Sequence, residues 1–258
     1  MSMGVEKVAV VTGAASDIGA ALCRRLVTAG VCVVAADGDA ARLRQLSQGL
    51  DGATRYTQVV DVADDDQVRR LLTGTVADLG RLDYLFNTAD LRIDGEFTAL
   101  PLSRCHDMVE VDMWGMVHGT RHGYAVMRAQ GFGHIVNTVS VAGMLPTARS
   151  VAYAMTQHAV VGLTTSLRAE AAGSGVRISV AVPGATPARA AEPAARSPKL
   201  LRRKPIDALA PDRAACAIMR GVRRNQQYII VPRYSRAMIA AYRWFPNLVG
   251  GLLAPRDG

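Results

Sequence analysis

The sequence predicts an α/β fold, in which a doubly wound, seven-stranded and mostly parallel sheet carries helices on both faces. Short, continuous apolar runs such as residues 8–11 are typical of parallel strands that are buried on both sides. These runs alternate with longer segments that have the apolar periodicity of helices, as in strand–helix–strand units. The 258 residues contain no linker rich in Ser, Gly or Pro, so we expect one domain spanning residues 1–258.

Four of the strands are expected in the first 90 residues. The run at 8–11 leads through a turn into a helix that ends at Gly30, a residue typical of helix C-termini. Next come a strand at 31–36, a helix at 40–50, and strands at 56–60 and 82–86. Between the last two strands, Asp64, Asp65 and Asp66 open a helix, because carboxylates are stabilised by the positive end of the helix dipole.

Three further strands are expected in the rest of the chain. A long helical region at about 103–128 precedes a strand at 134–136, and a helix starts after Ser150, a good N-cap residue. Strands at 177–182 and 228–231 follow. Right-handed crossovers bring the carboxyl ends of parallel strands to one edge of the sheet, where ligands bind. The residues that follow strands, and should line that edge, are Gly13, Asp37, Asp61, Asn87, Ser140 and Pro183.

Net charge, apolar runs and cysteine spacing indicate which partners and which cellular compartment to expect. The formal net charge is +8, with the Arg excess after residue 188, which would suit a nucleic acid or a membrane surface. No apolar run reaches the roughly 18 residues that a membrane-spanning helix needs, and no signal peptide is recognisable. The four cysteines show neither C-x-x-C nor metal-ligand spacing, so we expect reduced thiols, no metal and a cytoplasmic location.

A glycine-containing turn, TGAASDIG at residues 12–19, follows the first strand. Glycines there allow the backbone to approach a pyrophosphate, which binds at the N-terminus of the next helix. The residues predicted to form this contact are Gly13, Ser16, Asp17, Ile18 and Gly19. Asp37 ends the second strand, where its carboxylate can accept hydrogen bonds from the adenosine ribose and repel a 2′-phosphate. The sequence therefore predicts a Rossmann-like dinucleotide site that prefers NAD(H) over NADP(H).

A second motif lies in residues 137–162. Ser140 follows a strand, while Tyr153 and Gln157 are four residues apart and share one face of the next helix. With the glycine turn, this arrangement resembles the short-chain dehydrogenase/reductase family over about residues 8–184. The resemblance implies hydride transfer between NAD(H) and a small alcohol or carbonyl substrate. It also implies that Tyr153 transfers a proton and that Ser140 holds the substrate oxygen. Gln157 and Asp112 stand where the family has its catalytic Lys and Asn.

The same resemblance implies further cofactor contacts. It assigns Asp61 and Val62 to the adenine, Asn87 and Ala89 to the nicotinamide ribose, and Pro183, Gly184 and Thr186 to the nicotinamide carboxamide. Asp90 stands where the family has a glycine next to that ribose.

The departures from the family pattern change the charge of the site. A carboxylate about 5 Å from a pyrophosphate costs roughly 3 kcal/mol at an effective dielectric near 20, so Asp17 should weaken binding about a hundredfold. Neutral Gln157 does not stabilise a tyrosinate, so much of the typical 10²–10⁴ contribution of general acid–base catalysis should be lost. Two structural alternatives stay open: Asp17 caps its own helix, and Asp112 pairs with Gln157.

Two C-terminal regions are predicted to make contacts outside the core. Residues 186–210 are basic and resemble a mobile substrate lid, which would suit an anionic substrate. Residues 234–258 form a tail that mixes apolar residues with arginines, suited to a partner subunit or an anionic membrane surface. The helix after Ser150 is apolar on several faces and resembles the family's dimer-forming helix, so we expect a homo-oligomer, dimer or tetramer.

Three functions remain open at this point. The first is an NAD(H)-linked dehydrogenase or reductase of weak or atypical activity. The second is a non-catalytic member of the same family that binds a ligand or partner in the cleft. The third is a basic scaffold associated with a membrane surface or a nucleic acid.

Overall fold

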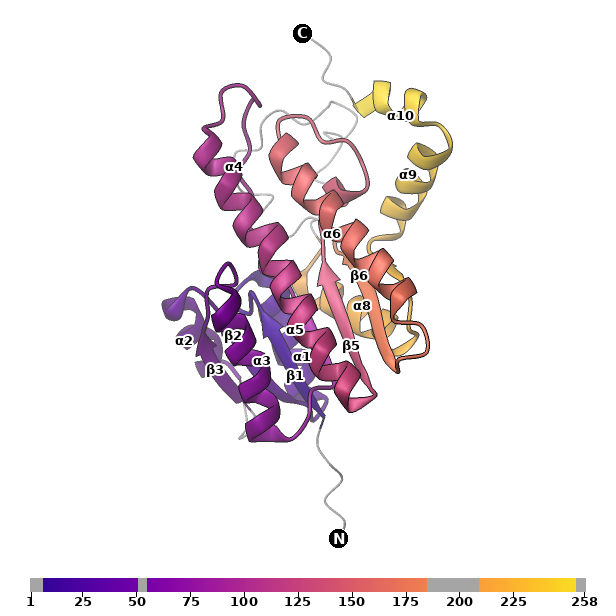
Figure 1. Cartoon of the computed structure of the whole chain (residues 1–258). Helices are drawn as coiled ribbons and strands as arrows, with labels where there is room; N and C mark the ends of the chain where they lie inside the picture. Colours follow the sequence, from indigo (N-terminus) through magenta and orange to yellow (C-terminus); the bar gives the residue numbers. More distant parts are fainter. Residues whose placement is uncertain (1–6, 51–54, 185–208, 254–258) are drawn as a thin grey trace.

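A computed structural model describes residues 7–50, 55–184 and 209–253 of the chain. Within them, seven strands form one sheet in the order β3-β2-β1-β4-β5-β6-β7, and every neighbouring pair is parallel. The strand order reverses between β1 and β4, which is the switch point at which doubly wound sheets bind ligands. The predicted α/β, Rossmann-like fold is confirmed, with a sheet that is wholly parallel (Figure 1).

The elements follow the predicted alternation, with boundaries that differ by one or two residues at most strand ends. The strands are β1 (Val8–Thr12), β2 (Cys32–Asp37), β3 (Arg55–Val59), β4 (Tyr84–Asn87), β5 (Gly133–Thr138), β6 (Val176–Val182) and β7 (Tyr228–Ile230). The helices are α1 (Asp17–Thr28), α2 (Ala40–Gln48), α3 (Asp65–Leu79), α4 (Leu102–Met108), α5 (Gly115–Gln130), α6 (Val151–Glu170), α8 (Pro211–Arg223), α9 (Arg233–Trp244) and α10 (Pro246–Leu253). A π-helix, η1 (Val109–Trp114), and a 3₁₀ turn, η2 (Val141–Gly143), complete the described elements.

Two layers of helices bury the sheet. Helices α1, α2 and α8 cover one face, and α3, α5 and α6 cover the other (Figure 1). Side chains alternate along each strand, so Val11 packs into the first layer while its neighbour Val10 packs into the second. Because both faces are covered, every position of a central strand favours an apolar residue, which explains the continuous apolar runs in the sequence.

The carboxyl ends of the strands meet at one edge, as predicted. Asn87, the last residue of β4, pairs with Thr12 in β1 and with Asn137 in β5. Thr12 in turn pairs with Ala36 of β2, directly before Asp37. The turns that follow these strands therefore converge on the β1–β4 switch point.

The structure refines two local expectations, the long helical region and the C-terminal tail, and corrects the expected cap at Ser150. The long helical region is divided into α4, η1 and α5, and its π-helical part contains Asp112. Ser150 precedes α6, but its hydroxyl hydrogen-bonds Asp94 and makes no capping bond to the helix. The expected C-terminal tail forms two helices, α9 and α10, as far as Leu253.

Part of the predicted C-terminal architecture cannot be compared with the structure. The predicted lid at 186–210 lies outside the described residues apart from its last two positions, and so do residues 254–258 of the tail. None of the helices that the structure describes is both long and apolar enough to cross a membrane.

Candidate functional site

The turn between β1 and α1 is a close passage of backbone that requires glycine. Gly13 has a φ of 62°, and a Cβ at this residue would lie 2.4 Å from the amide nitrogen of Ala89. A Cβ on Gly19 would lie 2.2 Å from the carbonyl oxygen of Gly13. The turn is thus held directly against the chain that leaves β4, and α1 begins at its far end.

Ser16, and not Asp17, caps helix α1. The Ser16 hydroxyl accepts a hydrogen bond from the Gly19 amide at 3.1 Å and donates one to the Gly13 carbonyl at 2.7 Å. Ile18 is buried in the core behind the turn, and Asp17 is the half-buried first residue of the helix. The alternative in which Asp17 caps its own helix is therefore wrong. Its carboxylate stays at the helix N-terminus, where a pyrophosphate would bind.

Asp37 is fixed beside the same turn. One carboxylate oxygen accepts a hydrogen bond from the Ala15 amide and the other from the Asp39 amide, both at 2.9 Å. The carboxylate is therefore held at the end of β2, next to the glycine turn. A fixed negative charge at this point suits ribose hydroxyls and repels a phosphate group.

Asp61 and Val62 follow β3 and lie at the outer end of the edge. Asp61 is exposed, and its Oδ1 accepts a hydrogen bond from the Ala63 amide at 3.0 Å. Val62 is buried, its carbonyl oxygen lies 3.0 Å from Nδ1 of His118, and a Cβ on Gly115 would lie 2.8 Å from its side chain. Contact of these two residues with adenine stays a prediction.

Tyr153 lies in the first turn of α6, with its ring in a small apolar cluster and only 1% of the residue exposed. Its hydroxyl donates a hydrogen bond to Oδ1 of Asp90 at 2.9 Å. A hydrogen bond with the Ser140 side chain lowers the Tyr153 pKa, and the Arg92 guanidinium lies 5.5 Å from the ring centre. The predicted Ser140–Tyr153 pair is thus brought together, with Asp90 as a third member.

Gln157 is buried one turn further along α6. Its Oε1 accepts a hydrogen bond from the backbone amide of Ser140 at 2.7 Å, and its Nε2 donates to Oδ1 of Asp90 at 3.4 Å. The amide therefore ties α6 to the end of β5, and it brings no positive charge. Asp90 receives hydrogen bonds from both Tyr153 and Gln157, so these three side chains form one polar cluster.

Asp112 is fully buried in the π-helix η1. Its two carboxylate oxygens accept hydrogen bonds from the Leu91 amide at 2.6 Å and from the Thr156 hydroxyl at 3.2 Å. Burial raises the pKa of Asp112 to about 7, although these hydrogen bonds and a further one from Gln157 lower it. The bond from Gln157 supports the predicted direct pairing of these two residues.

The electrostatics of the cluster hold the Tyr153 hydroxyl in its protonated form. Burial raises the pKa of Tyr153 above its ordinary value, and the negative charge of Asp112 raises it further. The hydrogen bond with Ser140 and the positive charge of Arg92 lower the Tyr153 pKa and offset only part of this shift. An uncharged Gln157 cannot supply the stabilisation that a lysine would give to a tyrosinate.

Asn87 belongs to the core of the sheet. Its Nδ2 donates to Oδ1 of Asn137 at 2.8 Å, and Thr120 and Thr164 complete a buried network that joins β4, β5, α5 and α6. The side chain of Asn87 is thus engaged in this network. Backbone contacts of Asn87 and Ala89 with a nicotinamide ribose stay a prediction.

Pro183 and Gly184 follow β6. They are the last of the predicted cofactor-contact residues that the structure describes. A Cβ on Gly184 would lie 2.8 Å from Cδ of Pro232, so this turn packs closely against the chain that leaves β7. Thr186, the remaining predicted cofactor contact, lies outside the described residues.

Sequence reasoning missed the hydrogen-bond partner of the Tyr153 hydroxyl. It identified Asp90 as an added charge, but the hydrogen bond to Tyr153 spans 63 positions of the chain and leaves no local pattern. Thr156, which contacts Asp112, was also missed. A weak signal was available for it, because residues three apart on a helix are neighbours and Thr156 follows Tyr153 by three.

The residues at this edge fit the adenosine diphosphate half of a dinucleotide better than the nicotinamide half. The close passage at Gly13, the N-terminus of α1 and the fixed carboxylate of Asp37 fit an adenosine diphosphate moiety. Asp17 adds a charge beside the pyrophosphate position. At the nicotinamide end, Asp90 and Gln157 replace the family's glycine and lysine and are bonded to each other.

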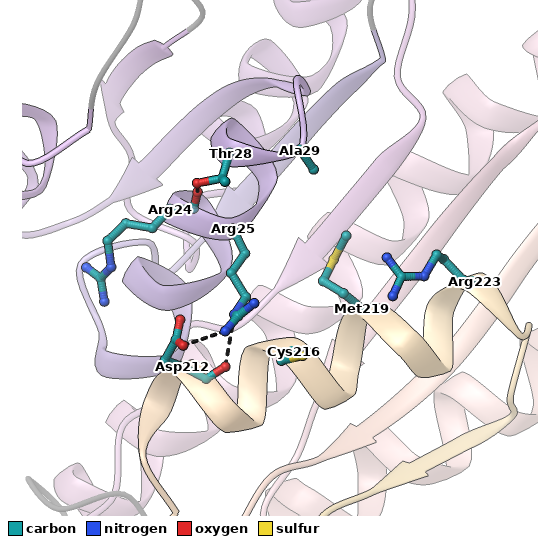
Figure 2. Close-up of a pocket in the computed structure, with 8 residues that line it drawn as sticks. All are labelled: Arg24, Arg25, Thr28, Ala29, Asp212, Cys216, Met219 and Arg223. Atoms are coloured by element: carbon teal, nitrogen blue, oxygen red, sulfur yellow. Dashed lines mark hydrogen bonds and ion pairs between the residues drawn. The ribbon is translucent and has the colours of Figure 1, made fainter.

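A separate hollow of about 440 Å³ lies between α1 and α8 (Figure 2). Its lining includes Arg24, Arg223 and Cys216, and Arg25 bridges it by pairing with Asp212. None of the residues predicted for catalysis or cofactor contact lines this hollow. Among the described residues, no group of three or more His, Cys, Asp or Glu side chains could hold a metal ion.

Comparison with known proteins agrees with this geometry. The family model described as short chain dehydrogenase matches residues 7–198. Cis-4-hydroxycyclohexanecarboxylate dehydrogenase of Sinomonas cyclohexanicum is 35% identical over 226 residues, which cover 83% of this chain and 88% of that protein. Levodione reductase of Leifsonia aquatica is 33% identical over 70% of this chain and 69% of its own. The structure of a short chain dehydrogenase/reductase from Burkholderia phymatum in complex with NAD has a TM-score of 0.85 and 27% identity, covering 100% of this chain and 99% of that one. Actinorhodin polyketide ketoreductase with NADPH has a TM-score of 0.77 and 26% identity, covering 85% of this chain and 91% of its own.

Proposed function

The chain belongs to the short-chain dehydrogenase/reductase family, and on that premise we propose that it is an NAD(H)-linked oxidoreductase of low activity. Its substrate class is a small alcohol or the corresponding carbonyl compound. The observation that carries the proposal is the Ser140–Tyr153 pair at the carboxyl edge of the sheet, next to the glycine turn.

The chain's own residues bind the cofactor, orient the substrate oxygen and exchange a proton with it. Gly13, Ser16 and the N-terminus of α1 hold the pyrophosphate, and Asp37 accepts hydrogen bonds from the adenosine ribose. The Ser140 hydroxyl orients the substrate oxygen, and Tyr153 donates its proton to that oxygen in reduction or removes it in oxidation. NAD(H), when bound, supplies or accepts the hydride.

The activity is low because the tyrosine is poorly prepared for proton transfer. Its hydroxyl donates to Asp90, so the proton points at a carboxylate instead of at a substrate. Burial and the charge of Asp112 raise the Tyr153 pKa, and Gln157 brings no opposing positive charge. The fraction of tyrosinate grows with pH, so we expect the residual oxidation of alcohols to rise steadily toward alkaline pH.

An anionic hydroxy acid is the substrate we favour. The relative from Sinomonas cyclohexanicum is named for a hydroxycyclohexanecarboxylate. The basic residues between 189 and 204 of this chain suit such a charge. We expect the rate of NAD⁺-dependent oxidation of cis-4-hydroxycyclohexanecarboxylate to exceed that of neutral cyclohexanol. Both rates are measured by the absorbance of NADH, and reduction of levodione is a third assay. Equal rates for the acid and the neutral alcohol would count against the anionic class.

Helix α6 is the surface at which we place a homo-oligomer contact. Val151 and Met155 are exposed large apolar side chains on this helix. Light scattering on the purified chain should give a dimer or tetramer mass. Met155→Asp should lower that mass, because it would bury a charge in the contact.

A second candidate is a non-catalytic family member that binds a ligand in the same cleft. The specific observation in its favour is that Asp90 engages both Tyr153 and Gln157, so the polar groups of the site are bonded to one another. An alcohol and carbonyl panel with no turnover, together with ligand-induced stabilisation of the fold, would favour this candidate over the enzyme.

Weak dinucleotide binding is a direct expectation of either candidate. Asp17→Gly should tighten NADH binding about a hundredfold, because it removes a charge that costs roughly 3 kcal/mol beside the pyrophosphate. NADH fluorescence titration measures this change. The control is Asp78→Asn on the exposed surface of α3, which also removes one carboxylate. It should leave the affinity for NADH unchanged. Low-micromolar binding by the unmodified chain would contradict the charge argument.

A further inference from the structure

The C-terminal helices α9 and α10 carry an apolar surface that the rest of the described chain does not cover. Trp244 is 79% exposed, Phe245 63%, Leu248 66% and Leu252 43%. Together with Tyr234, which is also exposed, these residues are called here the C-terminal apolar face. Helix α10 packs against α9 and has no buried residue. Soluble proteins rarely expose so many large apolar side chains together unless they bind something there.

The face is bordered by positive charge and has no acidic neighbour in the sequence. Arg236 and Arg243 are both exposed on α9, and their spacing of seven residues puts them on one side of that helix. The sequence from 213 to 256 contains no Asp or Glu. Exposed tryptophan and tyrosine beside arginines on α9, with exposed leucines on the adjoining α10, combine the side chains that bind at the interface of an anionic bilayer.

The same charge pattern disfavours a second copy of this chain as the occupant. A two-fold contact places the same patch of both protomers face to face. Any residue that Arg236 or Arg243 meets across such a contact therefore belongs to the same patch, and neither α9 nor α10 carries a carboxylate to offset the arginines. An anionic lipid surface supplies the missing negative charge without this repulsion.

We propose that the C-terminal apolar face docks onto an anionic phospholipid surface, with Trp244, Phe245 and Leu248 in the interface and Arg236 and Arg243 against the headgroups. No helix among the described residues is fit to span the bilayer, so the attachment is to one leaflet. Helices α9 and α10 stand at the same end of the molecule as the N-terminal ends of α4 and α6 (Figure 1). Because Tyr153 lies in the first turn of α6, the docked membrane and the candidate site are at one end of the protein.

The test uses the full chain and vesicles of equal parts phosphatidylglycerol and phosphatidylcholine, compared with phosphatidylcholine alone. The chain has two tryptophans, so Trp114→Phe leaves Trp244 as the only reporter. Its emission should shift to shorter wavelength with the anionic vesicles, and the chain should sediment with them. Leu248→Asp should abolish sedimentation. Arg236→Gln with Arg243→Gln should weaken it about thirtyfold, since each arginine near such a surface contributes about 1 kcal/mol.

Matched variants separate a specific face from the general positive charge of the chain. Arg24→Gln with Arg223→Gln removes the same charge at the hollow between α1 and α8 (Figure 2), and it should leave vesicle binding nearly unchanged. Equal loss with both pairs would refute docking through the C-terminal face. Failure of the unmodified chain to bind anionic vesicles would also overturn the proposal. The proposal would also be overturned if the unmodified chain were a dimer that does not bind vesicles and Leu248→Asp made it a monomer. A second copy of the chain would then be what covers the C-terminal apolar face.

Discussion

A chain that carries both Asp90→Gly and Gln157→Lys should reduce carbonyl substrates with NADH about 10²–10⁴ times faster than the unmodified chain. That range is the usual contribution of a general acid–base group whose pKa matches the working pH. In the present structure the Tyr153 hydroxyl donates to Asp90 at 2.9 Å, and burial raises its pKa. Removing the carboxylate frees the proton for a substrate oxygen, and the lysine favours the tyrosinate.

The rate is measured as kcat for a common ketone at saturating NADH, so that a change in cofactor affinity does not enter. Asp90→Gly with Gln157→Met is the matched control, because it removes the same hydrogen bonds without adding a positive charge. Tyr153→Phe in the improved chain should return the rate to background. If the unmodified chain already turns over as fast as the double variant, the site is not impaired and the charge argument is wrong.

Asp112→Asn should stabilise the fold at pH 8 by about 4 kcal/mol and leave its stability near pH 4 almost unchanged. Burial raises the pKa of Asp112 from an ordinary 3.8 to about 7. Between these values the unfolded chain loses the proton while the folded chain keeps it. The free energy of unfolding therefore falls as pH rises through this window, by about 1.4 kcal/mol per pH unit. Below both values Asp112 is neutral in both states and contributes no such loss.

The asparagine side chain has nearly the same shape, keeps an acceptor for the Leu91 amide and never ionises, so it removes this pH dependence. Urea unfolding of both chains at pH 4, 5.5, 7 and 8 measures the difference. Asp78→Asn, an exposed change on α3, should shift stability by less than about 0.5 kcal/mol at every pH. Parallel pH profiles for the unmodified chain and the Asp112→Asn variant would show that the carboxyl does not hold its proton in the fold.

Both predictions concern residues that could be identified from the sequence, whereas the hydrogen bond between Tyr153 and Asp90 and the complete burial of Asp112 could not. The motif at 137–162 identified Ser140, Tyr153 and Gln157, and the structure brings these three together. Asp90 was recognisable only as a charge at an unusual position. Its role as the acceptor of the hydrogen bond from the Tyr153 hydroxyl depends on how the chain leaving β4 passes the first turn of α6.

The C-terminal region shows the same division. The sequence shows a tail that mixes apolar residues with arginines, which would suit a membrane surface but more often packs against a partner subunit. Only the packing of α10 on α9 identifies which side chains stay exposed, because an apolar residue can equally well be buried against its own chain.

The alternation of strands and helices, the glycine turn at Gly13 and the edge at which the strand ends meet could all be predicted from the sequence. These features follow from local periodicity, from the conformational freedom of glycine and from the handedness of crossovers, all of which are properties of short segments. Three features became apparent only in the folded chain: Asp90 accepts a hydrogen bond from the Tyr153 hydroxyl, Ser16 caps α1 in place of Asp17, and Asp112 shares its buried environment with Gln157. The physical reason is that a hydrogen bond or a pKa shift depends on distances of a few ångströms and on burial, and residues far apart in the chain acquire both only when it folds.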